Sequence, residues 1–300
     1  MKTKKTFEYN NVRNGLRQIL WGMFKKLVIA DRLSLYVSSV LDNAGFHSGA
    51  SLALASIFYV FQMYADFSGY TDMALGFAKI LGFDLMQNFN RPFFAKSVSE
   101  FWRKWHISLS TWFADYFYTP IAVAKRDWGK LSVVYAFFVT FIVLGFWHGP
   151  NWTFIIFGAL QGFILTIEFF TRKTRKNFRK KIPEFLNSLV SMMFVFAYFG
   201  FSLIFFRAGT VSEALIIIKR IFTASGPLYF DRDEPSSFIF SVMGVLILMF
   251  VELKWEFYKG GFSFFNNKHW LVRNLSYAFL IIIILMIGVF DGGQFIYKQF

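Results

Sequence analysis

Residues 131–170 read LSVVYAFFVTFIVLGFWHGPNWTFIIFGALQGFILTIEFF. Two apolar runs, 131–147 and 152–170, flank the short turn-forming segment 148–151. At a rise of 1.5 Å per residue, a helix needs about 20 mostly apolar residues to cross the hydrocarbon core of a bilayer. The stretch therefore predicts two membrane-spanning helices joined by a tight turn.

The composition of the whole chain supports a membrane protein. Of its 300 residues 56% are hydrophobic, including 44 Phe, and 17% are charged, which is more large apolar surface than a soluble globule can bury. The net charge is +14, and on a soluble protein this excess would suggest a nucleic-acid partner. Here the basic residues gather between apolar runs, notably at 125–126 and 172–181, as they do in cytoplasmic loops. We therefore expect a bilayer around the chain and no nucleic-acid partner.

The apolar runs predict an all-α, polytopic integral membrane protein with one membrane domain over residues 1–300. Five runs are expected to span the bilayer, the fourth of them short and tilted or re-entrant: 131–147, 152–170, 185–206, 238–251 and 271–290. Two earlier segments, 16–41 and 51–65, are apolar enough to enter the bilayer. The first carries Lys25, Lys26, Asp31 and Arg32, which must lie at an interface or face other helices because a charge at the bilayer centre costs about 3 kcal/mol or more.

The basic segment 172–181 is predicted to be cytoplasmic, which places the segment 125–130 on the same side and the turn at 149–151 toward the outside or at membrane depth. Polar residues through Asn14 follow the basic N-terminus, so no signal peptide is expected. The chain has no Cys, which excludes disulfides, thiolate metal sites and a cysteine nucleophile. The spacings Gly145-x-x-x-Gly149 and Gly158-x-x-x-Gly162 favour close helix packing.

Residues 97–118 predict a different kind of element. Ser97 and Glu100 form a capping-box pattern, and aromatic residues follow at steps of three and four. This pattern is typical of an amphipathic helix that lies along an interface or lines a cavity, and Pro120 is expected to end it.

Two of the four histidines have unusual neighbours. His106 lies in FWRKWHISLS (101–110), and His148 lies in GFWHGPNW (145–152), where one span ends and the next begins. An ionisable residue in or near hydrocarbon is a candidate functional residue, and a buried neutral imidazole can act as a general base. A neutral histidine bonded to a carbonyl at a helix end is equally compatible with the pattern. His47 and His269 lie in polar loops and are not expected to be functional.

The segment 61–72 (FQMYADFSGYTD) places Asp66 and Asp72 at membrane depth. Two structures are compatible with it: a helix broken at Gly69 that lines a cavity, or a helix that ends at the interface with polar caps. Neither these carboxylates nor His106 and His148 show a metal-ligand spacing, so no metal is expected.

Four motifs together resemble the membrane-bound O-acyltransferases, most closely the bacterial branch that O-acetylates alginate and other exopolysaccharides. They are FQxYxDFSGYTDM (61–73), NFNRP (88–92), EFWRKWHISLSTW (100–112) and WHGPNWT (147–153), and residues 294–300 also resemble that branch's usual ending. The resemblance implies a ring of transmembrane helices with re-entrant and interfacial helices around a thin centre, where donor and acceptor meet from opposite sides.

The resemblance also implies roles for residues. His148 matches the family's invariant histidine and would be the general base, and His106 matches the second histidine and would position the thioester. Trp147 or Asn151 would stabilise the oxyanion. Candidate substrate-binding residues taken from the motifs are Trp147, Asn151, Asp66, Asp72, Asn88, Arg91, Trp102 and Arg103.

As the resemblance implies, the donor would be acetyl-coenzyme A or another acyl thioester, with no tightly bound cofactor. The acceptor would be a polysaccharide or peptidoglycan hydroxyl, reached through an extracytoplasmic SGNH or esterase-like partner. The protein would lie in the bacterial cytoplasmic (inner) membrane, in contact with membrane lipid.

The sequence departs from the family pattern in two places. Members usually have over a hundred further residues before the equivalent of Phe7, so we expect this chain to correspond to the C-terminal two-thirds of the fold. Residues 119–126 replace a Leu-Gly-Gly-Asn-Arg-like loop, which leaves the acceptor open. D-alanyl transfer to teichoic acid, a non-enzymatic role in polysaccharide export, and an inactive truncated copy remain as alternatives.

Overall fold

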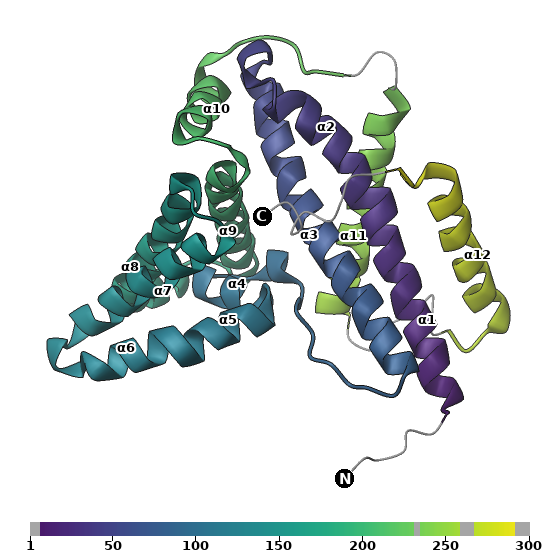
Figure 1. Ribbon diagram of the computed structural model, residues 1–300, viewed down its shortest axis with the longest axis horizontal. Coiled ribbons are helices and arrows are strands. Elements are labelled where there is room, and N and C mark those ends of the chain that lie inside the picture. Colours follow the sequence, from purple (N-terminus) through teal and green to yellow (C-terminus); the bar gives the residue numbers. More distant parts are fainter. Residues whose placement is uncertain (1–6, 231–234, 259–266, 292–300) are drawn as a thin grey trace. The chain divides into compact units, whose positions relative to one another are not determined.

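The computed structural model describes residues 7–230, 235–258 and 267–291. Within these ranges the chain is helical and has no β-strand (Figure 1), which confirms the all-α prediction. Its residues divide into two compact units, the first drawn from 1–43, 57–87 and 227–299 and the second from 44–56 and 88–226. A single membrane domain stays a prediction. The basic residues 1–5 and the motif at 294–300 lie outside the described residues.

The first unit begins with a long helix that runs through three consecutive segments. It consists of α1 (Tyr9–Met23), a π-helical segment (Phe24–Ala30) and α2 (Asp31–Leu41), and the backbone stays in the right-handed helical region at both junctions. The unit also contains most of α3 (Gly49–Ile80), together with α11 (Pro235–Phe257) and α12 (Trp270–Ile287).

Paired glycines let α1 and α3 approach closely. A Cβ on Gly22 would lie 2.5 Å from the carbonyl oxygen of Gly69, and one on Gly15 would lie 2.5 Å from that of Gly76. Both predicted structures for the segment 61–72 are therefore wrong, because α3 neither breaks at Gly69 nor ends near it but continues to Ile80. The glycine serves helix packing and not a kink.

The charges of the first apolar segment face other helical residues within the unit. Lys26 Nζ lies 2.7 Å from carboxylate oxygens of both Asp31 and Asp66. Lys25 pairs with Asp72, and its ammonium donates to Ser68 Oγ at 2.9 Å. The expectation that these charges face other helices is confirmed. Such pairing is required because an unpaired buried charge is costly.

The second unit is built around a helical hairpin. α7 (Lys130–His148) and α8 (Trp152–Arg179) are antiparallel, because Gly145 meets Phe154 and Gly158 meets Phe141. A Cβ on Gly158 would lie 2.0 Å from the carbonyl oxygen of Phe141. The predicted packing role of these glycines is confirmed. The remaining long helices of this unit are α9 (Glu184–Arg207) and α10 (Val211–Thr223).

The prediction of one amphipathic helix over 97–118 is wrong, because the structure divides this segment into several shorter helical elements. They are α4 (Val98–Lys104), α5 (Ile107–Phe113), a π-helical turn (Ala114–Tyr118) and α6 (Thr119–Ala124), with 3-10 turns at Ala44–Phe46, Pro92–Phe94 and Arg126–Trp128 elsewhere in the unit. The helix breaks at Trp105 and His106, where the chain turns. Pro120 lies in the first turn of α6 and does not end a helix, because proline is tolerated there. The predicted Ser97 cap is confirmed, since its side chain accepts from Glu100 N at 3.0 Å.

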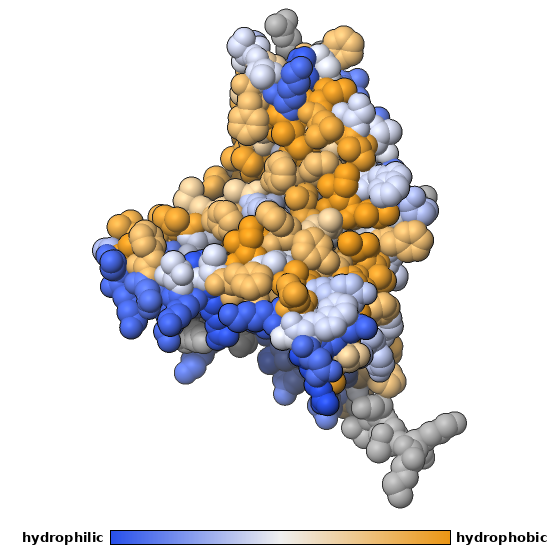
Figure 2. All heavy atoms as spheres, turned by 90° about the vertical axis from the view of Figure 1, so that its left-hand side faces the viewer, coloured by the Kyte–Doolittle hydropathy of each residue, from blue (hydrophilic) through white to orange (hydrophobic). Residues whose placement is uncertain are grey.

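Six helices in the described part of the chain are long and apolar enough to cross a bilayer: α3, α7, α8, α9, α11 and α12. The five predicted spans are among them, and α11, with 23 residues, is long enough to span without a re-entrant turn. On the face drawn in Figure 2, hydrophilic side chains collect along the lower border of a hydrophobic surface. The chain is a multi-pass membrane protein.

Candidate active site

His148 is the last residue of α7 and is buried, with 7% of its surface exposed. Its ring meets the edges of Trp147 at 4.9 Å and Phe206 at 5.0 Å between centroids. Beyond it Gly149 N donates to Phe146 O and Asn151 caps the start of α8, so the chain reverses within three residues. The sequence thus holds one imidazole rigidly at the end of the hairpin, among aromatic rings.

The two neighbours predicted to stabilise an oxyanion differ in their surroundings. Trp147 is half exposed. The side chain of Asn151 caps α8 by accepting from Thr153 N at 3.3 Å, and its Nδ2 donates to Gly209 O at 2.7 Å. Asn151 therefore secures the turn to the segment after α9. Oxyanion stabilisation by either residue stays a prediction.

His106 stands at the break between α4 and α5 with φ 42° and ψ 56°, in the left-handed region. Few non-glycine residues adopt this conformation, and it is found where the surroundings impose it, often at functional sites. Asn88 imposes it, because its carbonyl oxygen accepts from Ile107 N at 2.9 Å and its Oδ1 accepts from Ser108 N at 3.0 Å. The predicted substrate-binding residue Asn88 thus fixes the position of His106.

The imidazole of His106 is neutral at pH 7. Burial lowers its pKa to about 4, and its Nδ1 lies 3.5 Å from Ser108 Oγ. His106 and His148 are within electrostatic reach of each other, so a charge on one would act on the other. The structure brings the two predicted catalytic histidines into one unit and one neighbourhood.

A cavity of about 540 Å³ lies beside these elements, and we call it the inner cavity. Its lining is mostly apolar and comes from α4, α5, the following π-helical turn, α7 and α8: Ser99, Trp102, Arg103, Ile107, Ser110, Thr111, Phe113, Ala114, Tyr118, Phe137, Thr140, Phe141, Leu144 and Leu165.

The inner cavity approaches both histidines. Thr140, Leu144 and His148 are buried at four-residue spacing on one face of α7, so Leu144 lies one turn, about 6 Å, from His148. Ile107 directly follows His106. The buried hydroxyl of Thr140 has no hydrogen-bond partner among the described residues, which is unusual for a buried polar atom and is expected where a bound molecule supplies the partner.

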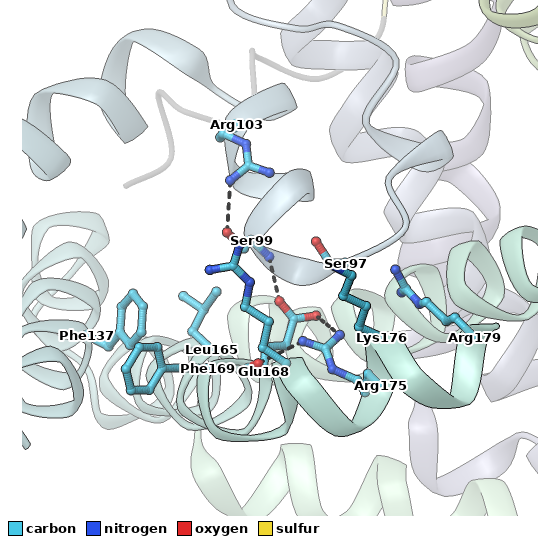
Figure 3. Close-up of a pocket in the computed structure, with 11 residues that line it drawn as sticks. Ser97, Ser99, Arg103, Phe137, Leu165, Glu168, Phe169, Arg175, Lys176 and Arg179 are labelled. Atoms are coloured by element: carbon cyan, nitrogen blue, oxygen red, sulfur yellow. Dashed lines mark hydrogen bonds and ion pairs between the residues drawn. The ribbon is translucent and has the colours of Figure 1, made fainter. Parts of the chain in front are cut away.

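A second cavity of about 510 Å³ adjoins the inner cavity and shares Ser99, Arg103, Phe137 and Leu165 with it. We call it the basic mouth because five basic side chains line it: Arg103, Arg175, Lys176 and Arg179, which Figure 3 labels, and Arg172. Its one carboxylate, Glu168, accepts from Val98 N at 2.9 Å and Ser99 N at 3.0 Å and lies 3.5 Å from Arg175. The mouth therefore keeps a strong positive charge that suits an anionic ligand.

Comparison with known sequences identifies the family. The model described as MBOAT, membrane-bound O-acyltransferase family, matches residues 1–210. The chain belongs to this family. The resemblance predicted from the four motifs is confirmed.

The relatives of this membrane-bound O-acyltransferase family member are named for three different polymers. A peptidoglycan O-acetyltransferase of Helicobacter pylori is 35% identical over 249 residues, 82% of this chain and 46% of that protein. The probable alginate O-acetylase AlgI of Pseudomonas syringae pv. tomato is 39% identical over 164 residues, 55% of this chain and 31% of the relative. A teichoic acid D-alanyltransferase of Bacillus subtilis is 28% identical over 194 residues, covering 62% of this chain and 49% of that enzyme. The matched part of the chain spans less than half the length of each.

Of the remaining residues predicted to bind substrate, two line the cavities and three do not. Trp102 and Arg103 line the inner cavity, and Arg103 also lines the basic mouth, where its Nη1 donates to Ser99 Oγ at 3.1 Å. Asp66 and Asp72 belong to the first unit, where they pair with lysines. Arg91 is half-buried with φ 48°, and its Nη2 donates to Asn90 Oδ1 at 2.8 Å. A substrate contact by these five residues stays a prediction.

The sequence did not predict a buried series of hydrogen-bonded polar side chains in this family member. Trp102 Nε1 donates to Gln161 Oε1 at 3.2 Å, and Gln161 Nε2 donates to Ser202 Oγ at 2.9 Å. Glu168 and Thr140, which line the two cavities, were missed as well. The available signal was a polar residue inside an apolar span, since such residues need partners in the bilayer.

Proposed function

We propose that this protein is a membrane O-acyltransferase that moves an acyl group from a thioester donor to a carbohydrate hydroxyl. We propose acetyl as the acyl group. The observation that carries the proposal is the pair of adjoining cavities, a basic mouth followed by an inner cavity that ends near the buried His148 and the half-buried His106. Family membership and the relatives that O-acetylate peptidoglycan and alginate support the same chemistry.

The two cavities suit the two ends of a donor such as acetyl-coenzyme A. The phosphates of the donor would lie among the arginines and lysines of the basic mouth, where charge-assisted hydrogen bonds are strongest. The uncharged thioester arm would lie in the mostly apolar inner cavity. This orientation brings the reacting carbonyl toward His148, with the Thr140 hydroxyl free to bond the arm.

One general base, His148, is enough for the acyl transfer. Neutral His148 accepts the proton of the acceptor hydroxyl as that oxygen attacks the thioester carbonyl. The tetrahedral intermediate then collapses, the C–S bond breaks, and the thiolate takes the proton back from His148. His106, neutral because burial lowers its pKa to about 4, positions the thioester without repelling a protonated His148.

The acceptor and the partner belong to the same proposal. The acceptor is a cell-surface polysaccharide or peptidoglycan hydroxyl, reached through an extracytoplasmic SGNH or esterase-like protein. The protein lies in the bacterial cytoplasmic membrane with the basic mouth facing the cytoplasm. The basic ends of α7 and α8 share one end of the hairpin, which supports donor entry from one side.

A second candidate is D-alanyl transfer from a carrier protein to teichoic acid. The similarity to the Bacillus subtilis D-alanyltransferase favours it, and a carrier-borne phosphopantetheine thioester would also suit the two cavities.

Transfer from labelled donors separates these functions. Membranes from cells that make the protein with its native neighbours receive either [14C]acetyl-coenzyme A or a carrier protein charged with [14C]D-alanine. We expect label to enter a cell-surface polymer from acetyl-coenzyme A and not from the carrier. Label from the carrier alone would establish the second candidate, and label from neither would indicate a non-enzymatic role such as polysaccharide export.

A further inference from the structure

A third cavity, of about 330 Å³, lies between α8 and α9, and we call it the α8–α9 groove. It has two chemically distinct parts. Lys96, Arg175 and Arg179 form its basic end, and the rest is mainly apolar, with Ile164, Ile167, Phe178, Ile182, Leu186, Val190, Phe194 and Val195. Its volume falls in the range of small-ligand pockets, about 300–1,000 Å³.

The apolar part of the groove faces the surroundings of the protein. Ile167, Leu186, Val190 and Phe194 are all exposed, although they belong to two helices that are long and apolar enough to span a bilayer. In a membrane these side chains meet hydrocarbon. From Ile164 to Arg175 the groove follows α8 for about 16 Å at 1.5 Å per residue, which is long enough for much of one acyl chain.

The basic end is held in place by hydrogen bonds. Arg179 Nη2 donates to Lys96 O at 3.0 Å and to Ser191 Oγ at 3.3 Å, which ties α8 to α9. Arg175 Nη2 donates to Glu168 O at 2.8 Å. The carboxylate of Glu168 is occupied by the amides of Val98 and Ser99 as well as by Arg175, so three cations at this end are balanced by one carboxylate. A fixed positive cluster at the end of an apolar groove complements an anionic headgroup with an attached acyl chain.

We infer that the α8–α9 groove binds one molecule of an anionic glycerophospholipid. Its phosphate lies against Lys96, Arg175 and Arg179, and one acyl chain follows the apolar side chains of α8 and α9. The groove shares Glu168, Arg175 and Arg179 with the basic mouth. Lys96 and the α9 side chains line the groove but not the basic mouth. Lipid binding at this site requires no catalytic activity.

The test is native mass spectrometry of the full chain, released from detergent in the presence of phosphatidylglycerol or phosphatidylcholine. We expect one phosphatidylglycerol to be retained in preference to phosphatidylcholine. Lys96→Gln should weaken its retention roughly fivefold, because one basic side chain beside an anionic headgroup has about that effect. Lys96→Arg keeps the charge and should retain the lipid, which separates loss of the site from loss of the fold. The matched control is Lys176→Gln, which removes the same charge from the basic mouth alone.

A second pair of variants tests the apolar part. Val190→Trp should fill the groove and abolish retention, whereas Leu189→Trp, at the exposed neighbouring position outside the groove, should leave it unchanged. Equal retention of phosphatidylcholine, or an equal loss in Lys96→Gln and Lys176→Gln, would overturn the inference. Displacement of the lipid by inorganic phosphate or coenzyme A would also overturn it and assign the groove to a free anion or to the donor.

Discussion

At the scale of single residues, the candidate site depends on polar groups held in places that would otherwise be unfavourable. His106 adopts a left-handed backbone conformation because Asn88 holds the start of α5, and His148 is enclosed by aromatic rings. The sequence could single out both histidines because their neighbours are apolar and aromatic. It could not reveal the turn at His106, because helical periodicity continues through residues 97–118 while the backbone does not.

The stability of the protein should depend on pH through His106. Its pKa is lowered from an ordinary 6.5 to about 4 by burial, so the unfolded chain binds the proton first as the pH falls. Stability is therefore fully present above pH 6.5 and is lost as the pH falls toward 4, by about 2–3 kcal/mol for this group. Thermal unfolding in detergent should show this loss. Asparagine also tolerates the left-handed conformation, so His106→Asn should fold and should lose less stability as the pH falls. A pH profile identical to that of the unchanged protein would contradict the role of His106.

The hydroxyl of Thr140 should serve a ligand and not the fold. Thr140→Val should leave thermal stability unchanged or raise it by up to about 1 kcal/mol, because the hydroxyl has no partner among the described residues. The same variant should raise KM for the acyl donor several-fold. Ser202→Ala is the contrasting control, since it breaks a bonded chain and should cost about 1–3 kcal/mol. A loss of stability in Thr140→Val as large as in Ser202→Ala would argue for a structural role.

At the scale of elements, the apolar runs predicted the spans well because length and hydropathy decide insertion into a bilayer. The ends of α7 and α9 fall within one residue of the predicted 131–147 and 185–206. The errors arose where tertiary contacts override local signals. Taken alone, Gly69 predicts a break in the helix. In the structure α1 packs directly against Gly69, and the residue allows this close contact while α3 continues unbroken. Pro120 signals a helix end, but in the first turn of a new helix it is accommodated.

The α7–α8 hairpin should be sensitive to any side chain at Gly158. Gly158→Ala places a Cβ 2.0 Å from the carbonyl oxygen of Phe141, so the two helices must separate. We expect a loss of about 1–3 kcal/mol in unfolding free energy, with reduced acyl transfer because His148 ends α7. Gly45→Ala, where no neighbour lies within 4 Å, is the control and should unfold as the unchanged protein does. Equal unfolding temperatures of the two variants would refute the close contact.

At the scale of the whole molecule, charge and hydropathy predicted a multi-pass helical membrane protein, and the structure and the family match agree. The two cavities could not be predicted from the sequence. Their linings combine residues whose separation in the chain reaches 82 residues, from Ser97 to Arg179. The sequence revealed the basic segment and the histidines separately. Only the fold shows that cavities run from one toward the other.

The topology can be tested directly because the chain has no cysteine. Asp127→Cys and Lys176→Cys lie near the basic ends of α7 and α8, and Pro150→Cys lies in the turn at the other end. We expect a membrane-impermeant maleimide to label Pro150→Cys in intact cells and the other two only after permeabilisation. Labelling of Lys176→Cys in intact cells would reverse the proposed direction of donor entry.

The central claim is that His148 carries acyl transfer. The most direct measurement compares transfer of [14C]acetyl from acetyl-coenzyme A to cell-surface polymer in membranes that contain the unchanged protein, His148→Ala or His269→Ala, at matched protein levels. We predict a loss of at least 100-fold in His148→Ala, because general base catalysis contributes about 10²–10⁴-fold, and full activity in His269→Ala, whose histidine lies outside the site. Near-normal transfer by a folded His148→Ala protein would contradict the account.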